Sequence, residues 1–416
     1  MTHAQASSLL ALITSDSVHG SLYRDAAIFN QEIDRLWHRV WVYLGHESEL
    51  PNAGDYVRRS IGRQPHLIVR GNDRKIRIFF NRCRHRANLI CHKEKGSGPE
   101  LMCPYHGWVY RLDGSCLART MPDAYPASPL IQTFNLTEIP RTGNYRGLIF
   151  GSLAGDGVSL EDHLGLAKKY LDLILDRSPS GTVNLGAGVQ KMRYRGNWKM
   201  LPENSLEGAY HGNFIHHFAF RLADKRTGRV RSSSHKNSVL TLPGGHMVED
   251  FRSTKFTKPT AKTLVQEEYW SSLLRAHGEE RVNEVMSGRT PMLFVFPNLI
   301  YIQTHFRRLH PVSVDETYVY YQPALLDGVP PEINREILRQ HESYFGPAGF
   351  LASDDLEILE RTQVGVQASG NEWLYIGRGL DRESVLENGA IAGNSMDENQ
   401  LRGFWRHYSA TMTKSD

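Results

Sequence analysis

The sequence has few cysteines and no long hydrophobic run. Four cysteines in 416 residues are too few for the disulfide framework of a secreted protein. No apolar stretch approaches the roughly 18 residues that a membrane-spanning helix needs. Residues 1–15 also have no charged region ahead of their short apolar stretch, unlike a secretory signal. We therefore expect a cytoplasmic protein that does not enter a membrane.

A strong excess of one charge is also missing. The chain has 49 Lys and Arg against 45 Asp and Glu, a formal net charge of +4. So small an excess gives little support to nucleic-acid binding. The hydrophobic share of 40% is ordinary for a globular protein, and a chain of this length predicts two domains.

Two short motifs each pair a cysteine with a histidine. Cys83-x-His85 and Cys103-x-x-His106 are separated by residues 86–102. A Rieske [2Fe-2S] cluster needs two Cys on one iron and two His on the other. A closed Cys2His2 zinc site is the alternative, but zinc fingers pair Cys with Cys and His with His. Because each motif here offers one of each, we predict the cluster.

The neighbours of these motifs fit the same prediction. Pro104 restricts the backbone between the second pair of ligands, and Gly107 lets the chain pass close to a cluster. Cys91 and Cys116 have no His at the repeating spacing, so we expect small buried side chains and not ligands.

Basic residues surround the first motif, namely Arg82, Arg84, Arg86, Lys93 and Lys95. One interpretation is a solvated face. The other is a docking patch for an acidic electron donor, since opposite charge mainly speeds encounter.

Residues 203–217 bring together three histidines and two carboxylates. Mononuclear iron that activates dioxygen is typically held by two His and one carboxylate. On an ideal α-helix, His211 and His216 point about 140° apart. We therefore predict a π-type bulge near Gly212, because such bulges are common at functional sites. The alternative is a polar helix face without metal.

The third ligand is expected from residues 345–355, where a loop enters a probable helix with two adjacent carboxylates, Asp354 and Asp355. The alternative is that Ser353 or Asp354 caps that helix.

The hydrophobic pattern predicts an α+β protein. We expect an N-terminal helical segment over 1–37 that packs on the catalytic domain, a small antiparallel β domain over 38–152 with the cluster on two loops, and a mixed domain over 153–416 with an antiparallel sheet covered by helices. Helices are predicted over 159–175, 202–218, 263–287 and 331–345, strands over 292–303 and 317–324, and a mobile loop over 222–238.

These pieces together resemble the large (alpha) subunit of a Rieske non-haem iron aromatic-ring-hydroxylating oxygenase, closest to the terephthalate, salicylate and naphthalene branches. Besides the two ligand loops, the resemblance rests on residues 41–46, 196–199, 296–298, 346–355 and 403–405.

The resemblance implies that His211, His216 and Asp355 bind the catalytic Fe(II) and that Asn204 lines the site. His217 and Asp354 remain the alternatives for one imidazole and for the carboxylate. It further implies electrons from NAD(P)H through a reductase, with or without a ferredoxin, and a ring of three subunits, α3 or α3β3 with a small β subunit.

The chain departs from the family at one position. The family usually has Asp three residues before the first His, where it links that ligand to a Rieske His of the next subunit. Here that position is Gly208, and the carboxylate is Glu207, one residue earlier. Glu207 precedes His211 by four residues and so shares its helix face, and we expect it to take the same role.

The sequence says least about the substrate. An apolar pocket is expected from Leu206, Ala209, Phe214, Phe294, Phe296, Phe350 and Leu351, each of which is otherwise a core residue. Arg307 and Arg308 follow a predicted strand, and one facing the pocket would hold a carboxylate in a bidentate contact. We therefore expect dihydroxylation of an aromatic acid. The alternatives are a Rieske monooxygenase (ring hydroxylation or O-demethylation), an electron carrier without catalysis, and a zinc-stabilised binding protein.

Overall fold

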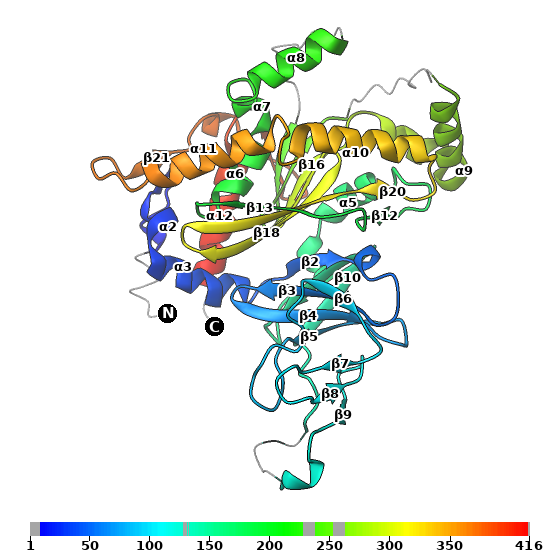
Figure 1. Ribbon diagram of the computed structural model, residues 1–416. Helices are drawn as coiled ribbons and strands as arrows, with labels where there is room; N and C mark the ends of the chain where they lie inside the picture. Colours follow the sequence, from blue (N-terminus) through cyan, green and yellow to red (C-terminus); the bar gives the residue numbers. More distant parts are fainter. Residues whose placement is uncertain (1–8, 128–130, 132, 228–237, 253–262, 415–416) are drawn as a thin grey trace. The chain divides into compact units, whose positions relative to one another are not determined.

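The computed structural model describes residues 9–127, 131, 133–227, 238–252 and 263–414. The chain divides into two compact units, residues 37–160 and residues 1–36 with 161–416. Both units are built on antiparallel sheets, and helices pack on the sheet of the second (Figure 1). The α+β class is therefore confirmed. Among the described residues, no helix has the length and apolar character to cross a bilayer.

The smaller unit contains three antiparallel sheets, with strand orders β10-β11-β2, β5-β4-β3-β6 and β7-β8-β9. The strands are β2 (Val42–His46), β3 (Asp55–Ile61), β4 (Gln64–Arg70), β5 (Ile76–Phe80), β6 (Lys95–Ser97), β7 (Leu101–Met102), β8 (Val109–Tyr110), β9 (Cys116–Ala118), β10 (Arg141–Tyr145) and β11 (Leu148–Ser152).

The core of this unit includes the two motif cysteines. Cys83 and Cys103 are 2% and 1% exposed, in one buried cluster with Phe79 and Trp108. Cys91 belongs to the same cluster, as expected. Cys116 is only partly buried, because it lies on the short edge strand β9, so the expectation of a buried side chain is wrong there.

The larger unit is organised around one sheet, with the order β13-β19-β18-β17-β16-β15-β14-β23-β22. Its strands are β13 (Gln190–Tyr194), β14 (Ser238–Leu242), β15 (His246–Asp250), β16 (Met292–Val295), β17 (Leu299–Ile302), β18 (His305–Ser313), β19 (Glu316–Pro323), β22 (Ser384–Val385) and β23 (Ile391–Asn394). Two short pairs flank it, β1 (Ser17–His19) with β21 (Trp373–Tyr375) and β12 (Val183–Asn184) with β20 (Leu325–Leu326).

Its helices are α2 (Ser21–Arg24), α3 (Ala26–Glu32), α5 (Ala167–Leu175), α6 (Met200–Leu206), α7 (Gly208–His211), α8 (His217–Thr227), α9 (Leu264–Met286), α10 (Pro331–Phe345), α11 (Ala352–Gly365) and α12 (Asn399–Thr413). Helix α4 (Leu160–Leu164) lies between α3 and α5 in the chain, at the boundary of the units. Helices α6 and α12 both contact β15, and α11 contacts α6 and β13. Three helices thus pack on the sheet, and α6 contacts the other two.

Several predicted elements differ in detail. The run 292–303 is a hairpin of β16 and β17 and not one strand, because residues 296–298 form its turn. The helix predicted over 159–175 is two helices, since Gly165 between them has a positive φ of 43°. Of the predicted mobile loop, residues 222–227 belong to α8, and residues 228–237 lie outside the described part of the chain.

Helix α6 is tied to the N-terminal segment by buried polar contacts. The Lys199 ammonium lies 2.6 Å from a Glu32 carboxylate oxygen, and both side chains are fully buried. Within α6, Glu203 accepts hydrogen bonds from Tyr23 (2.8 Å) and Trp405 (2.7 Å). Because buried charges are costly unless paired, these contacts fix the helix that leads to the histidine-rich segment.

Candidate metal centres and cavity

The first candidate site lies on two loops of the smaller unit. Cys83 and His85 lie between β5 and β6, and Cys103 and His106 lie between β7 and β8. The His85 and His106 rings are 4.5 Å apart between centroids. The two sulfurs are close enough that burial and the neighbouring Cys103 thiol raise the pKa of Cys83.

The four side chains fit a Rieske cluster. The Nδ1 atom of His85 is buried and makes no hydrogen bond to any described residue. Buried polar atoms are normally bonded, so an unbonded ring nitrogen beside a second imidazole and two buried thiols fits a set of metal ligands. The donor set is two sulfurs and two nitrogens, which is the Rieske composition.

The two loops share one backbone geometry. The Cys83 carbonyl accepts from Ala87 N–H (3.0 Å), and the Cys103 carbonyl accepts from Gly107 N–H (3.0 Å). Ala87 and Gly107 both have positive φ, 60° and 68°. Glycine adopts this conformation freely, whereas alanine pays a steric penalty of roughly 1 kcal/mol. The sequence predicts that Gly107 lets the chain pass close to a cluster; the second positive-φ position, Ala87, was not revealed by the sequence.

Two aromatic residues contact the ligands directly. Tyr110 Oη lies 3.2 Å from Cys83 Sγ and accepts from Arg84 N–H at 3.1 Å. Its own proton is therefore free to be donated to the sulfur. The Trp108 ring is parallel to the His85 ring, with an interplanar angle of 4° and centroids 5.0 Å apart.

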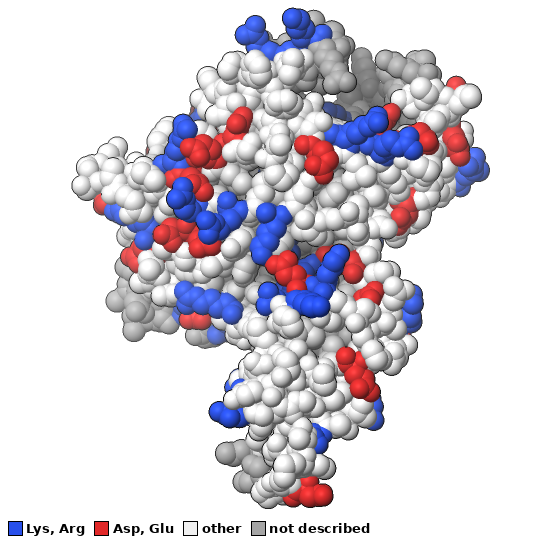
Figure 2. Space-filling model, in the orientation of Figure 1, with Lys and Arg blue, Asp and Glu red and all other residues white. Residues whose placement is uncertain are grey.

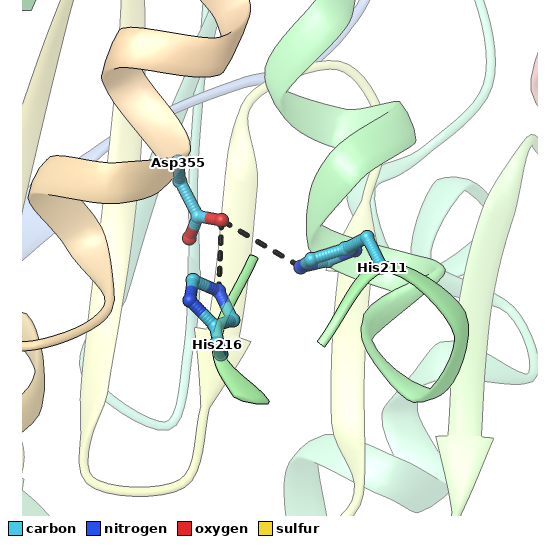
Figure 3. Close-up of side chains that lie close together, drawn as sticks. All are labelled: His211, His216 and Asp355. Atoms are coloured by element: carbon cyan, nitrogen blue, oxygen red, sulfur yellow. Dashed lines mark ion pairs between the residues drawn. The ribbon is translucent and has the colours of Figure 1, made fainter. Parts of the chain in front are cut away.

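The second candidate site joins three side chains from α7, the following turn and α11. Ligand atoms of His211, His216 and Asp355 all lie within 4.8 Å of one another. Asp355 Oδ1 is 3.0 Å from His216 Nε2 and 3.6 Å from His211 Nε2, and both rings point at this carboxylate (Figure 3). Burial by itself favours a raised pKa for Asp355, but the His216 hydrogen bond and the charges of His211 and Arg307 lower it.

The predicted π-bulge near Gly212 is wrong. Helix α7 ends at His211, residues 212–216 are turns, and α8 begins at His217. The His211 carbonyl accepts from Phe214 N–H (2.8 Å) and Ile215 N–H (3.0 Å) in this turn. Two short helices joined by this turn, and not one distorted helix, bring the two imidazoles together.

The alternative ligands lie outside this group. His217 is exposed, and its Nδ1 lies 2.9 Å from the Phe214 carbonyl. The Asp354 side chain is 54% exposed and reaches only within 4.0 Å of His216 Nδ1. The structure shows no side-chain cap from Ser353 or Asp354 either, because α11 begins at Ala352, before both of them.

Asn204 and Glu207 flank the three side chains. Asn204 Nδ2 donates to Asp355 Oδ1 at 3.3 Å. Glu207 Oε1 is 3.9 Å from His211 Nδ1, and its Oε2 accepts from Arg378 at 3.2 Å. Burial raises the pKa of Glu207 to about 7 although Arg378 opposes the shift.

A cavity of about 750 Å³ of empty space, partly open to solvent, adjoins the three side chains. Arg307 and Leu351 line it, as expected, together with His211, His216 and Asp355. Phe294 and Phe296 do not line it; they are fully buried against Phe404 of α12.

Two other predicted wall residues lie outside the cavity. Phe350 is 48% exposed and Phe214 is 64% exposed, and neither lines the cavity. Of the two neighbouring predicted wall residues, Leu351 lines the cavity and Phe350 does not. The side chains of Leu206 and Ala209 lie outside what the structure describes.

Arg307 and Arg308 do not follow a strand but lie within β18, on opposite faces. Arg308 stacks on Tyr320 at 3.9 Å and does not line the cavity. Arg307 is 1% exposed and donates to His305 Nε2 (2.9 Å) and Ser205 Oγ (3.3 Å). Among the described residues, no carboxylate lies within 4.0 Å of its guanidinium.

Sequence reasoning missed part of the cavity wall. The structure adds Ser205, Phe220, Glu249, Met292, Ile302, Gln303 and Phe345. The sequence does carry a signal for the contact between His305 and Arg307, because residues two apart on a strand share a face. The other wall residues are brought together by pairing between distant strands, which no local pattern reports.

The basic residues around the first motif, Arg82, Arg84, Arg86, Lys93 and Lys95, are all exposed. Arg86 also lies 5.4 Å above the exposed Tyr105 ring. Lys and Arg are interspersed with Asp and Glu on the visible face of the molecule, which shows no broad field of one sign (Figure 2).

Comparison with protein families gives two matches. Residues 40–135 match the Rieske [2Fe-2S] domain, and residues 179–414 match the ring hydroxylating alpha subunit (catalytic domain). The two ranges contain every residue of the two candidate sites.

Known proteins agree with this result. The chain is 31% identical to the 2-halobenzoate 1,2-dioxygenase large subunit of Burkholderia cepacia, over 88% of this chain and 82% of the relative. It is 28% identical to the anthranilate 1,2-dioxygenase large subunit of Acinetobacter baylyi, over 86% and 79%. Naphthalene 1,2-dioxygenase from Rhodococcus, solved with indole bound, superposes with a TM-score of 0.82 at 26% identity, covering 95% and 94% of the two chains.

Proposed function

Because this chain belongs to the family of ring-hydroxylating oxygenase alpha subunits, we propose that it is a terminal oxygenase that dihydroxylates an aromatic carboxylate. As a family member it is an oxidoreductase with a Rieske cluster and a mononuclear iron. The substrate class and the number of oxygen atoms transferred are the proposal.

The observation that supports a carboxylate substrate is the environment of Arg307. This guanidinium is buried in the cavity wall without a carboxylate partner among the described residues. A buried charge is costly unless it is closely paired, and a substrate carboxylate would pair directly with this guanidinium in a charge-assisted contact. The printed names of relatives, 2-halobenzoate and anthranilate dioxygenases, point to the same class.

We assign His211, His216 and Asp355 to the iron, and Cys83, His85, Cys103 and His106 to the cluster. When bound, the iron activates dioxygen and the cluster supplies electrons one at a time. The chain itself holds the ring against the three iron ligands. Met292, Ile302 and Phe345 exclude water from one side of the ring, and Asn204 fixes the Asp355 carboxylate by its hydrogen bond.

Electrons are proposed to come from NAD(P)H through a reductase, with or without a ferredoxin. The exposed basic residues beside Cys83 and His85 would attract an acidic donor. Glu207, placed between His211 and Arg378, is proposed to link the iron ligand to a cluster ligand of a neighbouring subunit in an α3 or α3β3 assembly.

We further propose residues 38–152 as the cluster domain, 153–416 as the catalytic domain and 1–37 as a segment that supports it, in a cytoplasmic enzyme. The contacts of Tyr23 and Glu32 with α6 support the last assignment.

Turnover of benzoate under labelled dioxygen, with purified reductase, tests the proposal. A cis-diol with two labelled atoms is expected. One labelled atom in a phenol would make the protein a monooxygenase on the same site. No product from any aromatic, with only the cluster's two irons bound, would make it an electron carrier.

A further inference from the structure

One face of the large sheet forms the floor of the cavity, and its strand register orders the polar groups on it. Glu249 of β15 is opposite Met292 of β16. Phe294, two residues on, is opposite Ile300 of β17, which is opposite Arg307 of β18. Directly opposed residues, and residues two apart on a strand, share a face. Glu249, Met292, Ile302 and Arg307 therefore all point into the same cavity, as its lining confirms.

The strand register also separates the two charged side chains of the floor, Glu249 and Arg307. Strands β15 and β18 are three strand spacings apart, which corresponds to roughly 14 Å between their backbones. Met292 and Ile302, 8% and 6% exposed, occupy the two strands between them. The floor thus has a cationic end at Arg307, an apolar middle, and an acidic end at Glu249, which is only 2% exposed.

A second cation lies at the acidic end, but in a different environment. Arg289 lines the cavity where it is exposed to solvent, with its guanidinium 4.2 Å above the Phe251 ring. The neutral polar residues of the cavity wall are Asn204, Ser205, Asn213 and Gln303. Water screens an exposed charge much more than a buried one, so the exposed Arg289 interacts with a bound ligand less strongly than a buried cation would.

We infer that the cavity is a two-ended binding site for an aromatic acid that carries an amino or hydroxyl group on the far side of its ring. This inference rests on the proposed function: Arg307 binds the carboxylate, and Glu249 accepts a hydrogen bond from the second substituent. The ring lies over Met292 and Ile302, beside the three iron ligands. A second carboxylate is rejected because it would face the buried Glu249.

The pairing of groups predicts an order of affinity. A carboxyl group accepts from N–H or O–H but offers nothing to a methyl group of similar size. A hydrogen bond to such a group corresponds to roughly a tenfold preference. The expected order of affinity is therefore para-aminobenzoate, then para-toluate, then terephthalate.

Equilibrium dialysis of these three acids against the anaerobic, fully metal-loaded protein tests the inference without turnover. We expect about tenfold tighter binding of the amino than of the methyl compound, with terephthalate weakest. In Glu249→Gln the preference for the amino over the methyl compound should shrink severalfold, and the affinity for terephthalate should rise. Asp250→Asn is the matched control, because the neighbouring Asp250 binds Arg252 and does not line the cavity; it should leave the order unchanged.

Other outcomes separate this inference from the proposed function. Equal binding of the amino and methyl acids, or tightest binding of terephthalate, overturns the role of Glu249 while leaving the carboxylate site intact. Binding of toluene but of none of the acids overturns both. The comparison of the three acids on the unmodified protein stands even if Glu249→Gln does not fold.

Discussion

His305 accepts a hydrogen bond from Arg307, its neighbour two positions along β18, with 2.9 Å between Nε2 and Nε. Burial, with the nearby Arg307 charge, holds the pKa of His305 well below its ordinary value, so the imidazole stays neutral and keeps its acceptor nitrogen. The Tyr321 and Phe345 rings lie 4.9 and 5.2 Å from the guanidinium. Arg307 is thereby oriented before any ligand arrives.

Replacing His305 should therefore weaken carboxylate binding specifically. His305→Phe keeps an aromatic ring but removes the acceptor, and we expect the dissociation constant of benzoate to rise roughly tenfold while that of toluene stays the same. His305→Gln, whose amide oxygen can accept, should restore part of the affinity. Calorimetric titration of both ligands measures the effect, and equal losses for benzoate and toluene would show a general packing defect instead.

Replacing one predicted iron ligand should remove one iron. His211→Ala leaves the loops of Cys83 and Cys103 untouched, so the visible spectrum of the cluster should persist while iron content falls by one atom per chain and product formation stops. His217→Ala is the matched control, because that exposed side chain lies outside the ligand group. Undiminished turnover by His211→Ala would remove His211 from the site.

The Tyr110 hydroxyl should raise the reduction potential of the cluster. Donation to Cys83 Sγ stabilises the more negative reduced state. If the hydrogen bond stabilises the reduced cluster over the oxidised one by about 1 kcal/mol, its removal lowers the one-electron reduction potential by roughly 40 mV. Spectroelectrochemical titration of Tyr110→Phe should show this fall. Tyr56→Phe, which removes a hydroxyl beside the non-ligand Cys91, should not, and an identical shift in both variants would contradict the assignment.

The Glu207 carboxylate should matter for electron arrival more than for substrate binding. Its position 3.9 Å from His211 Nδ1 suits a partner that orients a metal-bound imidazole, and loss of such partners commonly costs 10- to 100-fold. We expect Glu207→Gln to slow single-turnover oxidation of the reduced cluster by about that range, with an unchanged dissociation constant for benzoate. Equal single-turnover rates would leave Glu207 with a structural role only.

Acid should destabilise the fold through His246. Its Nδ1 accepts from Phe296 N–H (3.0 Å), which needs the neutral ring, while its Nε2 donates to the His163 carbonyl at 2.6 Å. Burial lowers the pKa of His246 from 6.5 to about 4. Between these values the unfolded chain binds more protons, so stability is complete above pH 6.5 and is lost as pH falls towards 4, by up to about 3 kcal/mol.

Urea unfolding at neutral pH and near pH 5 measures this loss. His246→Gln can keep both hydrogen bonds without titrating, and it should be less stable at neutral pH but lose less on acidification. The same pH slope in variant and parent would place the acid sensitivity elsewhere.

The sequence was informative where a site is local. Cys83 and His85 share one loop, and Cys103 and His106 share another, so the spacing within each motif already places one thiol beside one imidazole. The iron ligands were predicted as a set, but not their backbone: a turn over 212–216, which α-helical geometry does not anticipate, replaces the bulge. Phe350 and Leu351 show how far such a prediction can go. The sequence does not tell which of two neighbouring residues at a helix start faces the cavity.

Long-range pairing explains the rest. Glu249 and Arg307 share a cavity because four strands are held in one register, and that register is set by contacts between segments far apart in the chain. Phe294 and Phe296 have the composition of a substrate wall, yet packing against Phe404 of α12 buries them in the core. Composition identifies apolar candidates, whereas tertiary packing decides between wall and core.

The most direct test of the account is the metal content of the purified chain. Iron and acid-labile sulfide analysis should find three irons and two sulfides per chain, with the third iron absent from His211→Ala. Zinc in place of iron, or two irons with nothing bound by His211, His216 and Asp355, would contradict it.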